Sequence, residues 1–240
     1  MIPSTPSVAA VQRVARYASR RLKAALAPGW AFLRYRQRHP GLANPYRILF
    51  LSPACVTRRL SGRLEPAPVP GSVIDGDWDN SAIPFRDTLK YRGLTEHFVD
   101  GVPWRDTVLF QEHYRIRLET SERVLGMTSL DALCAHYQKT VDPLFAEIRN
   151  RGLRPPSLWN TIDPIDVHLG RSGCAILGMG GNHRVAMAQI LDVPQIPVRV
   201  GCRHLHWQIL RDQISKQKDP VFVPVELREH PDLRDLLRPG

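Results

Sequence analysis

The stretch that decides the fold reads Gly178-Met179-Gly180-Gly181-Asn182-His183-Arg184. It follows a short apolar run, Cys174-Ala175-Ile176-Leu177, and it precedes a helical pattern that continues to Leu191. Glycine tolerates positive φ angles and interrupts regular structure. The pattern therefore predicts a strand, a tight turn over residues 178–181 and a helix that begins at Asn182.

Two further strands flank this unit. Residues 163–169 alternate between polar and apolar side chains, and a turn at residues 171–173 connects them to the run at 174–177. After the helix, Asp192-Val193-Pro194 turns the chain, and residues 196–200 are typical of a third strand.

A long helical pattern lies upstream of these strands. Thr128-Ser129-Leu130-Asp131 resembles a capping box and predicts a helix start. Asp142-Pro143 predicts a second start, because proline is favoured at the first helical position, and Gly152 is expected to end the helix.

The glycine turn has the features of an anion site. The first backbone N–H groups of a helix point outward and carry partial positive charge, which favours a phosphate group. Arg184 adds a planar set of donors, and His183 adds a donor that titrates near neutral pH. A purely structural strand-to-helix connection is the alternative interpretation.

The order of elements, together with Gly180-Gly181-Asn182-His183-Arg184 and Ile196-Pro197-Val198, resembles the ParB/sulfiredoxin superfamily over residues 129–201. The resemblance implies a nucleotide-binding fold in which Gly180, Gly181, Asn182, His183 and Arg184 hold the phosphates of ATP or CTP with Mg²⁺. Sulfiredoxins carry a cysteine where this chain has Asn182, and an amide is not a nucleophile, so sulfiredoxin chemistry is not expected. A kinase-like branch would need a carboxylate base, for which Asp163 or Asp166 is the candidate.

A second group of polar residues follows the third strand. Arg203, His204 and Trp207 are candidates to line the nucleotide cleft, since Trp can stack on a base and Arg can pair a phosphate. If the strand continued, Cys202, His204 and His206 would share one face, but their spacing is not that of a common zinc site. No metal site is predicted.

The positive charge is concentrated near the start of the chain. Residues 1–63 hold 12 of the 33 Lys and Arg residues and no Asp or Glu, so the remainder is close to neutral. A helical pattern from Val8 to about Leu33 places arginines opposite an apolar stripe, and a basic, turn-rich connection at residues 34–45 follows it. Packing on the body, binding to DNA or an anionic membrane, and an organelle-targeting role all remain open.

Composition sets the remaining limits. The four cysteines form no C-x-x-C pair, and no apolar run has a membrane-spanning length, which favours a cytoplasmic protein, either free or peripheral at a membrane. Asp75-Gly76-Asp77-Trp78-Asp79 lacks the glutamate of a calcium loop and indicates a turn anchored by Trp78.

We expect an α+β fold with a small mixed sheet, divided into a basic extension (1–47), a strand and a helical aromatic-rich segment (48–127), the ParB/sulfiredoxin-like domain (128–220) and a tail (221–240).

Overall fold

The computed structural model describes residues 29–30, 32–65, 67–120, 123–155, 165–217 and 223–237. Its strands are β1 (Ile48–Leu51), β2 (Arg58–Arg59), β3 (Ser72–Ile74), β4 (Ile83–Pro84), β5 (Ile165–Leu169), β6 (Ala175–Leu177) and β7 (Ile196–His204). Its helices are α2 (Leu89–Phe98), a π-helix (Leu109–Tyr114), α3 (Arg115–Thr120), α4 (Leu130–Arg151), α5 (Asn182–Ile190), α6 (Leu205–Gln217) and α7 (Arg234–Leu237). Short 3₁₀ turns occur at Pro53–Cys55, Phe85–Asp87, Trp104–Asp106, Val225–Leu227 and Pro231–Leu233.

The strands form one mixed sheet in the order β1-β7-β5-β6-β2-β4, and β3 pairs with the far end of β7. The β5·β7, β2·β6 and β3·β7 pairs are parallel, and the others are antiparallel. The expected α+β class with a mixed sheet is confirmed. Strands from residues 48–84 and from residues 165–204 share this sheet, so the segments 48–127 and 128–220 are joined through backbone hydrogen bonds.

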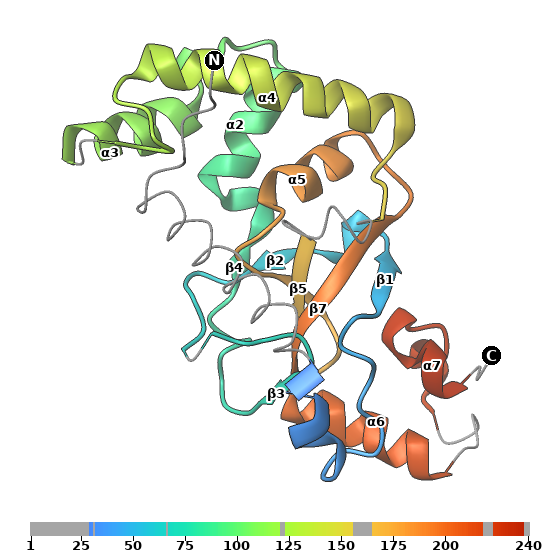
Figure 1. Cartoon of the computed structure of the whole chain (residues 1–240). Coiled ribbons are helices and arrows are strands. Elements are labelled where there is room, and N and C mark those ends of the chain that lie inside the picture. Colours follow the sequence, from blue (N-terminus) through green and yellow to red (C-terminus); the bar gives the residue numbers. More distant parts are fainter. Residues whose placement is uncertain are drawn as a thin grey trace, which may run out of the picture.

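The core lies between one face of the sheet and the helices above it in Figure 1, where α5 and α2 pack beneath α4. Ile165, Val167 and Leu169 alternate along β5 and are buried against this layer. The intervening residues Asp166 and His168 therefore face the opposite side of the sheet, which we call the outer face.

Helix α4 differs from the expectation in two respects. The helix starts in the predicted stretch and ends before Gly152, but its cap is Ser129, which accepts a hydrogen bond from the backbone N–H of Ala132, and not Thr128, the first residue of the box-like pattern. The second start predicted at Asp142-Pro143 is wrong, because the helix continues through Pro143. An interior proline costs about 3 kcal/mol, and burial of Val141, Phe145 and Ile148 on the same helix face offsets that cost.

The aromatic-rich segment is helical, as predicted, and its aromatic side chains are core residues. Trp104, Phe110 and Tyr114 are each 2% exposed or less, and they pack edge-on or tilted against one another and Tyr137 of α4. Packing against α4 explains the aromatic content without a role in stacking nucleobases.

Only part of the predicted N-terminal helix can be compared with the structure, because residues 1–28 and 31 lie outside the described residues. Residues 29, 30 and 32–36 are helical, so helix occupies the first residues of the connection expected at residues 34–45. The following segment docks on α6, where Asp212 accepts hydrogen bonds from His39 and from the backbone N–H of Gly41. No helix in the described part of the chain is long and apolar enough to cross a bilayer.

Candidate functional site

The turn between β6 and α5 has the predicted conformation. Gly181 has a φ of 82°, and a Cβ at this position would lie 2.9 Å from the Cα of Ile165 on β5. Only glycine combines that left-handed backbone with so close an approach. The turn therefore places the first N–H groups of α5 at the start of β5.

Asn182 holds the turn together. Its side chain is buried, its Nδ2 donates to the carbonyl oxygen of Met179 at 2.9 Å, and its Oδ1 accepts from Nε of Arg59 at 2.7 Å. Arg59 comes from β2, whose parallel pairing with β6 sets it opposite Leu177. The amide thus connects the turn to a cation 123 residues earlier in the chain.

Four positively charged side chains, Arg59, Lys90, Arg117 and Arg184, form what we call the cationic cluster. They come from β2, the first turn of α2, α3 and the first turn of α5. Burial lowers the pKa of Lys90, and the charges of Arg59 and Arg117 lower it further. Burial also lowers the pKa of Arg59.

Three members of the cationic cluster, Arg59, Lys90 and Arg117, have no carboxylate partner among the described residues. Among the described residues, no carboxylate makes an ion pair or hydrogen bond with Arg59, Lys90 or Arg117. Partly buried charges normally have partners, because removing a charge from water is costly. Within the described residues, Arg59, Lys90 and Arg117 therefore place positive charge without a paired carboxylate beside a helix N-terminus.

His183 occupies a different position from the one its sequence context suggested. Its Nε2 is hydrogen-bonded to the Tyr137 hydroxyl at 3.1 Å, and that hydroxyl is hydrogen-bonded in turn to the Tyr114 hydroxyl. Burial, followed by the charges of Lys90 and Arg184, lowers the pKa of His183 to about 4. The ring is neutral at pH 7 and supports α5 from inside, so the positive charge of the site comes from Lys and Arg.

The π-helix brings a second neutral ring to the same place. Burial lowers the pKa of His113, and Arg117 and Lys90 lower it further. π-Helices are rare and often occur at functional sites. Neither the π-helix nor the contribution of Arg59, Lys90 and Arg117 was predicted, because these residues lie far from the glycine turn in the sequence and belong to no local motif.

Of the two carboxylates considered as bases, the structure describes only Asp166, which is not part of the cluster. Asp163 lies outside the described residues. Asp166 projects from the outer face of β5, where its Oδ1 accepts a hydrogen bond from Nε of Arg199 at 2.9 Å. The cluster lies around α5, which covers the other face of the sheet.

Arg203, His204 and Trp207 are not brought to the turn. Each is 2% exposed or less, and both Arg203 Nε and Trp207 Nε1 donate to Asp232 at 2.9 Å. Arg203 aligns with Leu169 at the end of β5, whereas Gly181 contacts Ile165 at its start. Leu169 and Ile165 are four strand residues, or about 13 Å, apart. The Arg203, His204 and Trp207 side chains therefore do not line a cleft at the turn.

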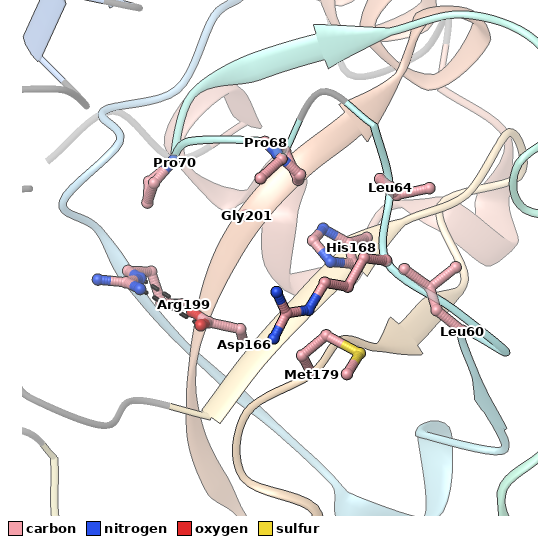
Figure 2. Close-up of a pocket in the computed structure, with 11 residues that line it drawn as sticks. Leu60, Leu64, Pro68, Pro70, Asp166, His168, Met179, Arg199 and Gly201 are labelled. Atoms are coloured by element: carbon pink, nitrogen blue, oxygen red, sulfur yellow. Dashed lines mark hydrogen bonds and ion pairs between the residues drawn. The ribbon is translucent and has the colours of Figure 1, made fainter.

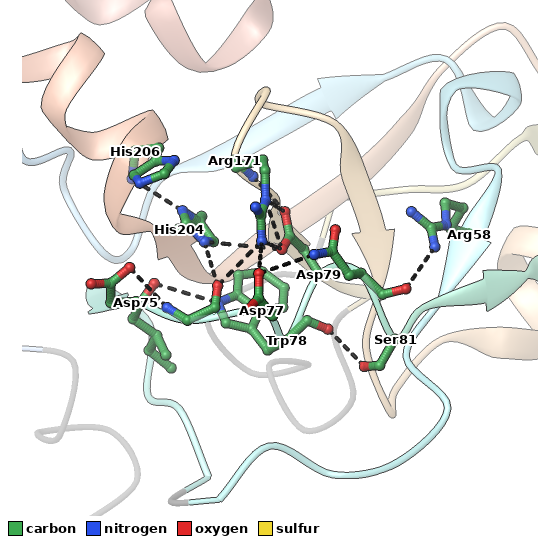
Figure 3. Close-up of polar contacts among 12 residues, drawn as sticks. Arg58, Asp75, Asp77, Trp78, Asp79, Ser81, Arg171, His204 and His206 are labelled. Carbon is green, nitrogen blue, oxygen red and sulfur yellow. Dashed lines mark hydrogen bonds and ion pairs between the residues drawn. The ribbon is translucent and has the colours of Figure 1, made fainter.

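The aspartate-rich loop is a structural turn (Figure 3). Arg171 donates hydrogen bonds to Asp77 and Asp79, and Trp78 contacts His168 and His204, which confirms that Trp78 anchors the turn. Burial alone would raise the pKa of the Asp79 carboxyl, but hydrogen bonds from Arg171 lower it to about 2. Both carboxylates are paired with Arg171, the Asp79 carboxylate buried and the Asp77 carboxylate exposed.

The Cys202, His204 and His206 side chains do not converge. Strand β7 ends at His204 and α6 begins at Leu205, so the alternation expected of a continuing strand is wrong. Cys202 contacts Nδ1 of His168, while Nε2 of His204 donates to the carbonyl oxygen of Gly76. Within the described ranges, no group of three His, Cys, Asp or Glu side chains is placed to hold a metal ion.

Comparisons of the chain with known protein families, curated proteins and solved structures find no match. The geometry of the turn and the cationic cluster is therefore the basis for a functional assignment.

Proposed function

We propose that this protein binds the phosphate groups of a nucleotide, ATP or CTP, between the β6–α5 turn and the cationic cluster. The observation that carries the proposal is the positive charge of Arg59, Lys90 and Arg117, which three separate elements bring to one helix N-terminus and which no described carboxylate pairs. The ParB/sulfiredoxin resemblance of the glycine turn supports the same assignment.

The electrostatics of the unliganded site favour a multiply charged anion. Like charges that are partly removed from water repel one another strongly, and the pKa of Lys90 is lowered by its burial and then by repulsion from Arg59 and Arg117. A triphosphate would place negative charge beside these cations, so that attraction to the phosphates would offset the repulsion between them. It would also accept charge-assisted hydrogen bonds from Arg and Lys. The α5 N–H groups would contribute further donors, as at other helix N-termini that bind phosphate.

Each group has a distinct part in the proposed site. Arg59 is held by Asn182, so its guanidinium is oriented before a ligand arrives. Lys90 acts as a point charge from α2, and neutral His183 fixes the start of α5 through Tyr137. Mg²⁺ would reach the site on the phosphate oxygens and keep several waters, as it commonly does.

The proposal is limited to binding. Asp166 is ion-paired with Arg199 on the outer face, so we assign no phosphoryl transfer or hydrolysis step to it. Binding without chemistry, kinase-like transfer and nucleotide hydrolysis would share the same phosphate site.

Calorimetric titration with ATP, CTP and tripolyphosphate, each with and without Mg²⁺, tests the proposal. We expect at least one nucleotide to bind and Lys90→Met to weaken it by about tenfold or more, the usual value of a charge-assisted contact. Lys90→Arg keeps the charge and should retain part of the affinity. Arg92→Met on the exposed side of α2 is the matched control and should leave binding unchanged.

Two results would contradict the proposal. One is no binding of any of the three anions to the wild-type protein. The other is equal loss of affinity in Lys90→Met and Arg92→Met, which would indicate a diffuse effect of net charge. Tripolyphosphate binding as tightly as the nucleotides would reduce the assignment to a polyphosphate site.

A further inference from the structure

A cavity of about 280 Å³ lies on the outer face of the sheet, on the side away from α5. Figure 2 shows its floor formed by β5 and β7, with residues of the β2–β3 connection above it. The volume equals about nine waters at ~30 Å³ each. The cavity can therefore hold a small organic molecule.

His168 forms the floor of the cavity. A Cβ on Gly201 would lie 2.7 Å from the His168 ring, and one on Gly178 would lie 2.8 Å from its Nε2. The absence of side chains at these two positions lets the ring lie flat across the sheet. His168 is only 7% exposed, and it lines the cavity.

The two ring nitrogens of His168 have different environments. Nδ1 lies 3.2 Å from the sulfur of Cys202, a buried thiol whose pKa burial raises to about 12. The thiol therefore stays protonated, and in the tautomer in which it donates to Nδ1 the ring proton lies on Nε2. Within the described part of the chain no group hydrogen-bonds Nε2, so this N–H is a donor without an acceptor.

The charges around the cavity are positive in sum. Asp166 and Arg199 neutralise each other through an ion pair in which each side chain is about 30% exposed. Arg63 also lines the cavity, and it has no hydrogen bond or ion pair to any described residue. The cavity thus offers one unpaired cation and one unpaired N–H donor.

The remaining wall is apolar. It consists of Leu60, Leu64, Ala67, Pro68, Pro70 and Met179. Proline rings are rigid and have no N–H, so Pro68 and Pro70 cannot donate a hydrogen bond to a ligand. An apolar ring with a single anionic end matches the arrangement.

We propose that the outer-face cavity is a second ligand site, which binds a small ring-bearing monocarboxylate. Its carboxylate accepts hydrogen bonds from Nε2–H of His168 and from Arg63, and its ring lies against the prolines and leucines of the β2–β3 connection. The site is separate from the phosphate site, because it uses the other face of the sheet and none of the cationic cluster.

Backbone amide NMR with benzoate as the probe tests this site, with benzamide and benzyl alcohol as uncharged analogues of similar shape. Benzoate should shift the resonances of residues 167–169, 178–179 and 199–201, and it should bind about tenfold more tightly than either analogue, because only it engages Arg63 as an ion. Arg63→Met should remove that preference. Arg92→Met is the control for net charge and should retain it.

A second variant keeps the test independent of Arg63. Ala67→Trp places a bulky ring at an exposed position on the cavity wall and should abolish benzoate binding while the thermal midpoint stays unchanged. Shifts confined to other surfaces would overturn the proposal, as would equal affinity for all three probes. Tripolyphosphate should not compete with benzoate, and Lys90→Met should bind benzoate normally, so failure of the phosphate site would be seen separately.

Discussion

Arginine or lysine side chains are partly or fully buried in two regions of this protein, and the regions differ in whether described carboxylates pair with these cations. At the C-terminal end, Asp232 is fully buried and accepts hydrogen bonds from Arg203, Arg211 and Trp207. In the cationic cluster, Arg59, Lys90 and Arg117 meet without any described carboxylate. Carboxylates pair with Arg203 and Arg211 at the C-terminal end, whereas no described carboxylate pairs with the three cations of the cluster.

The contrast distinguishes charged side chains that stabilise the fold from charged side chains that are available to bind a ligand. Arg203 and Arg211 fix residues 231–237 to β7 and α6, and Asp235 adds a further contact to Arg211 at 2.8 Å. A buried pair of this kind stabilises little by itself, but loss of one partner is costly. Among the described residues, Arg59, Lys90 and Arg117 have no such partner, and an anion from outside would supply one.

The largest effect is expected at the paired region. Asp232→Asn leaves Arg203 buried without its paired carboxylate and leaves Arg211 with Asp235 alone, and it should lower the free energy of unfolding by about 3–5 kcal/mol in a denaturant titration. Asp131→Asn is the control, because Asp131 is 76% exposed in its ion pair with Arg105 and should cost less than about 1 kcal/mol. Similar losses in both variants would show that the C-terminal network is not structural.

An intermediate effect should follow acidification. The pKa of His183 is about 4 in the folded protein and near 6.5 when unfolded, so only the unfolded chain binds the proton between these values. Stability should fall as the pH falls from 6.5 to 4, by up to about 3 kcal/mol from this group. His168, whose pKa burial also lowers to about 4, adds a similar loss. The pKa of Asp232 lies below its ordinary value, so that carboxylate contributes no loss in this window.

The His183→Gln variant isolates the contribution of His183, because glutamine can still hydrogen-bond Tyr137 and does not titrate. Its free energy of unfolding, measured between pH 7 and pH 4, should show a shallower slope than that of the wild-type protein. An unchanged slope would place the acid-sensitive groups elsewhere.

The smallest effect is a gain in stability. Lys90→Met removes a partly buried cation whose charged neighbours among the described residues are Arg59 and Arg117, and without ligand it should raise the free energy of unfolding by about 1 kcal/mol. The lowered pKa of Lys90 also predicts that the wild-type protein becomes more stable as the pH rises toward 10.5, since the unfolded chain then holds more protons than the folded one. This dependence should be weaker in Lys90→Met. Arg92→Met should show neither change, and destabilisation by Lys90→Met would mean that the cation is structural.

Much of the local structure was predictable from the sequence. Gly180-Gly181, the alternation in residues 163–169 and the box-like pattern at residues 128–131 are short-range signals, and each led to the correct element. The errors arose where tertiary packing outweighs a local preference. Pro143 continues a helix because its neighbours are buried, and His206 joins a helix because the chain changes from β7 to α6 after His204.

The sequence by itself determined the glycine turn, because backbone conformation at Gly181 depends on the absence of one Cβ. Only the tertiary structure decided which side chains meet there. Arg59 reaches the turn through the pairing of β2 with β6, Lys90 through the packing of α2 on α5, and Arg203 is held away by Asp232. Such contacts join residues far apart in the chain, and their energies depend on burial and on neighbouring charges, which no local pattern of residues specifies.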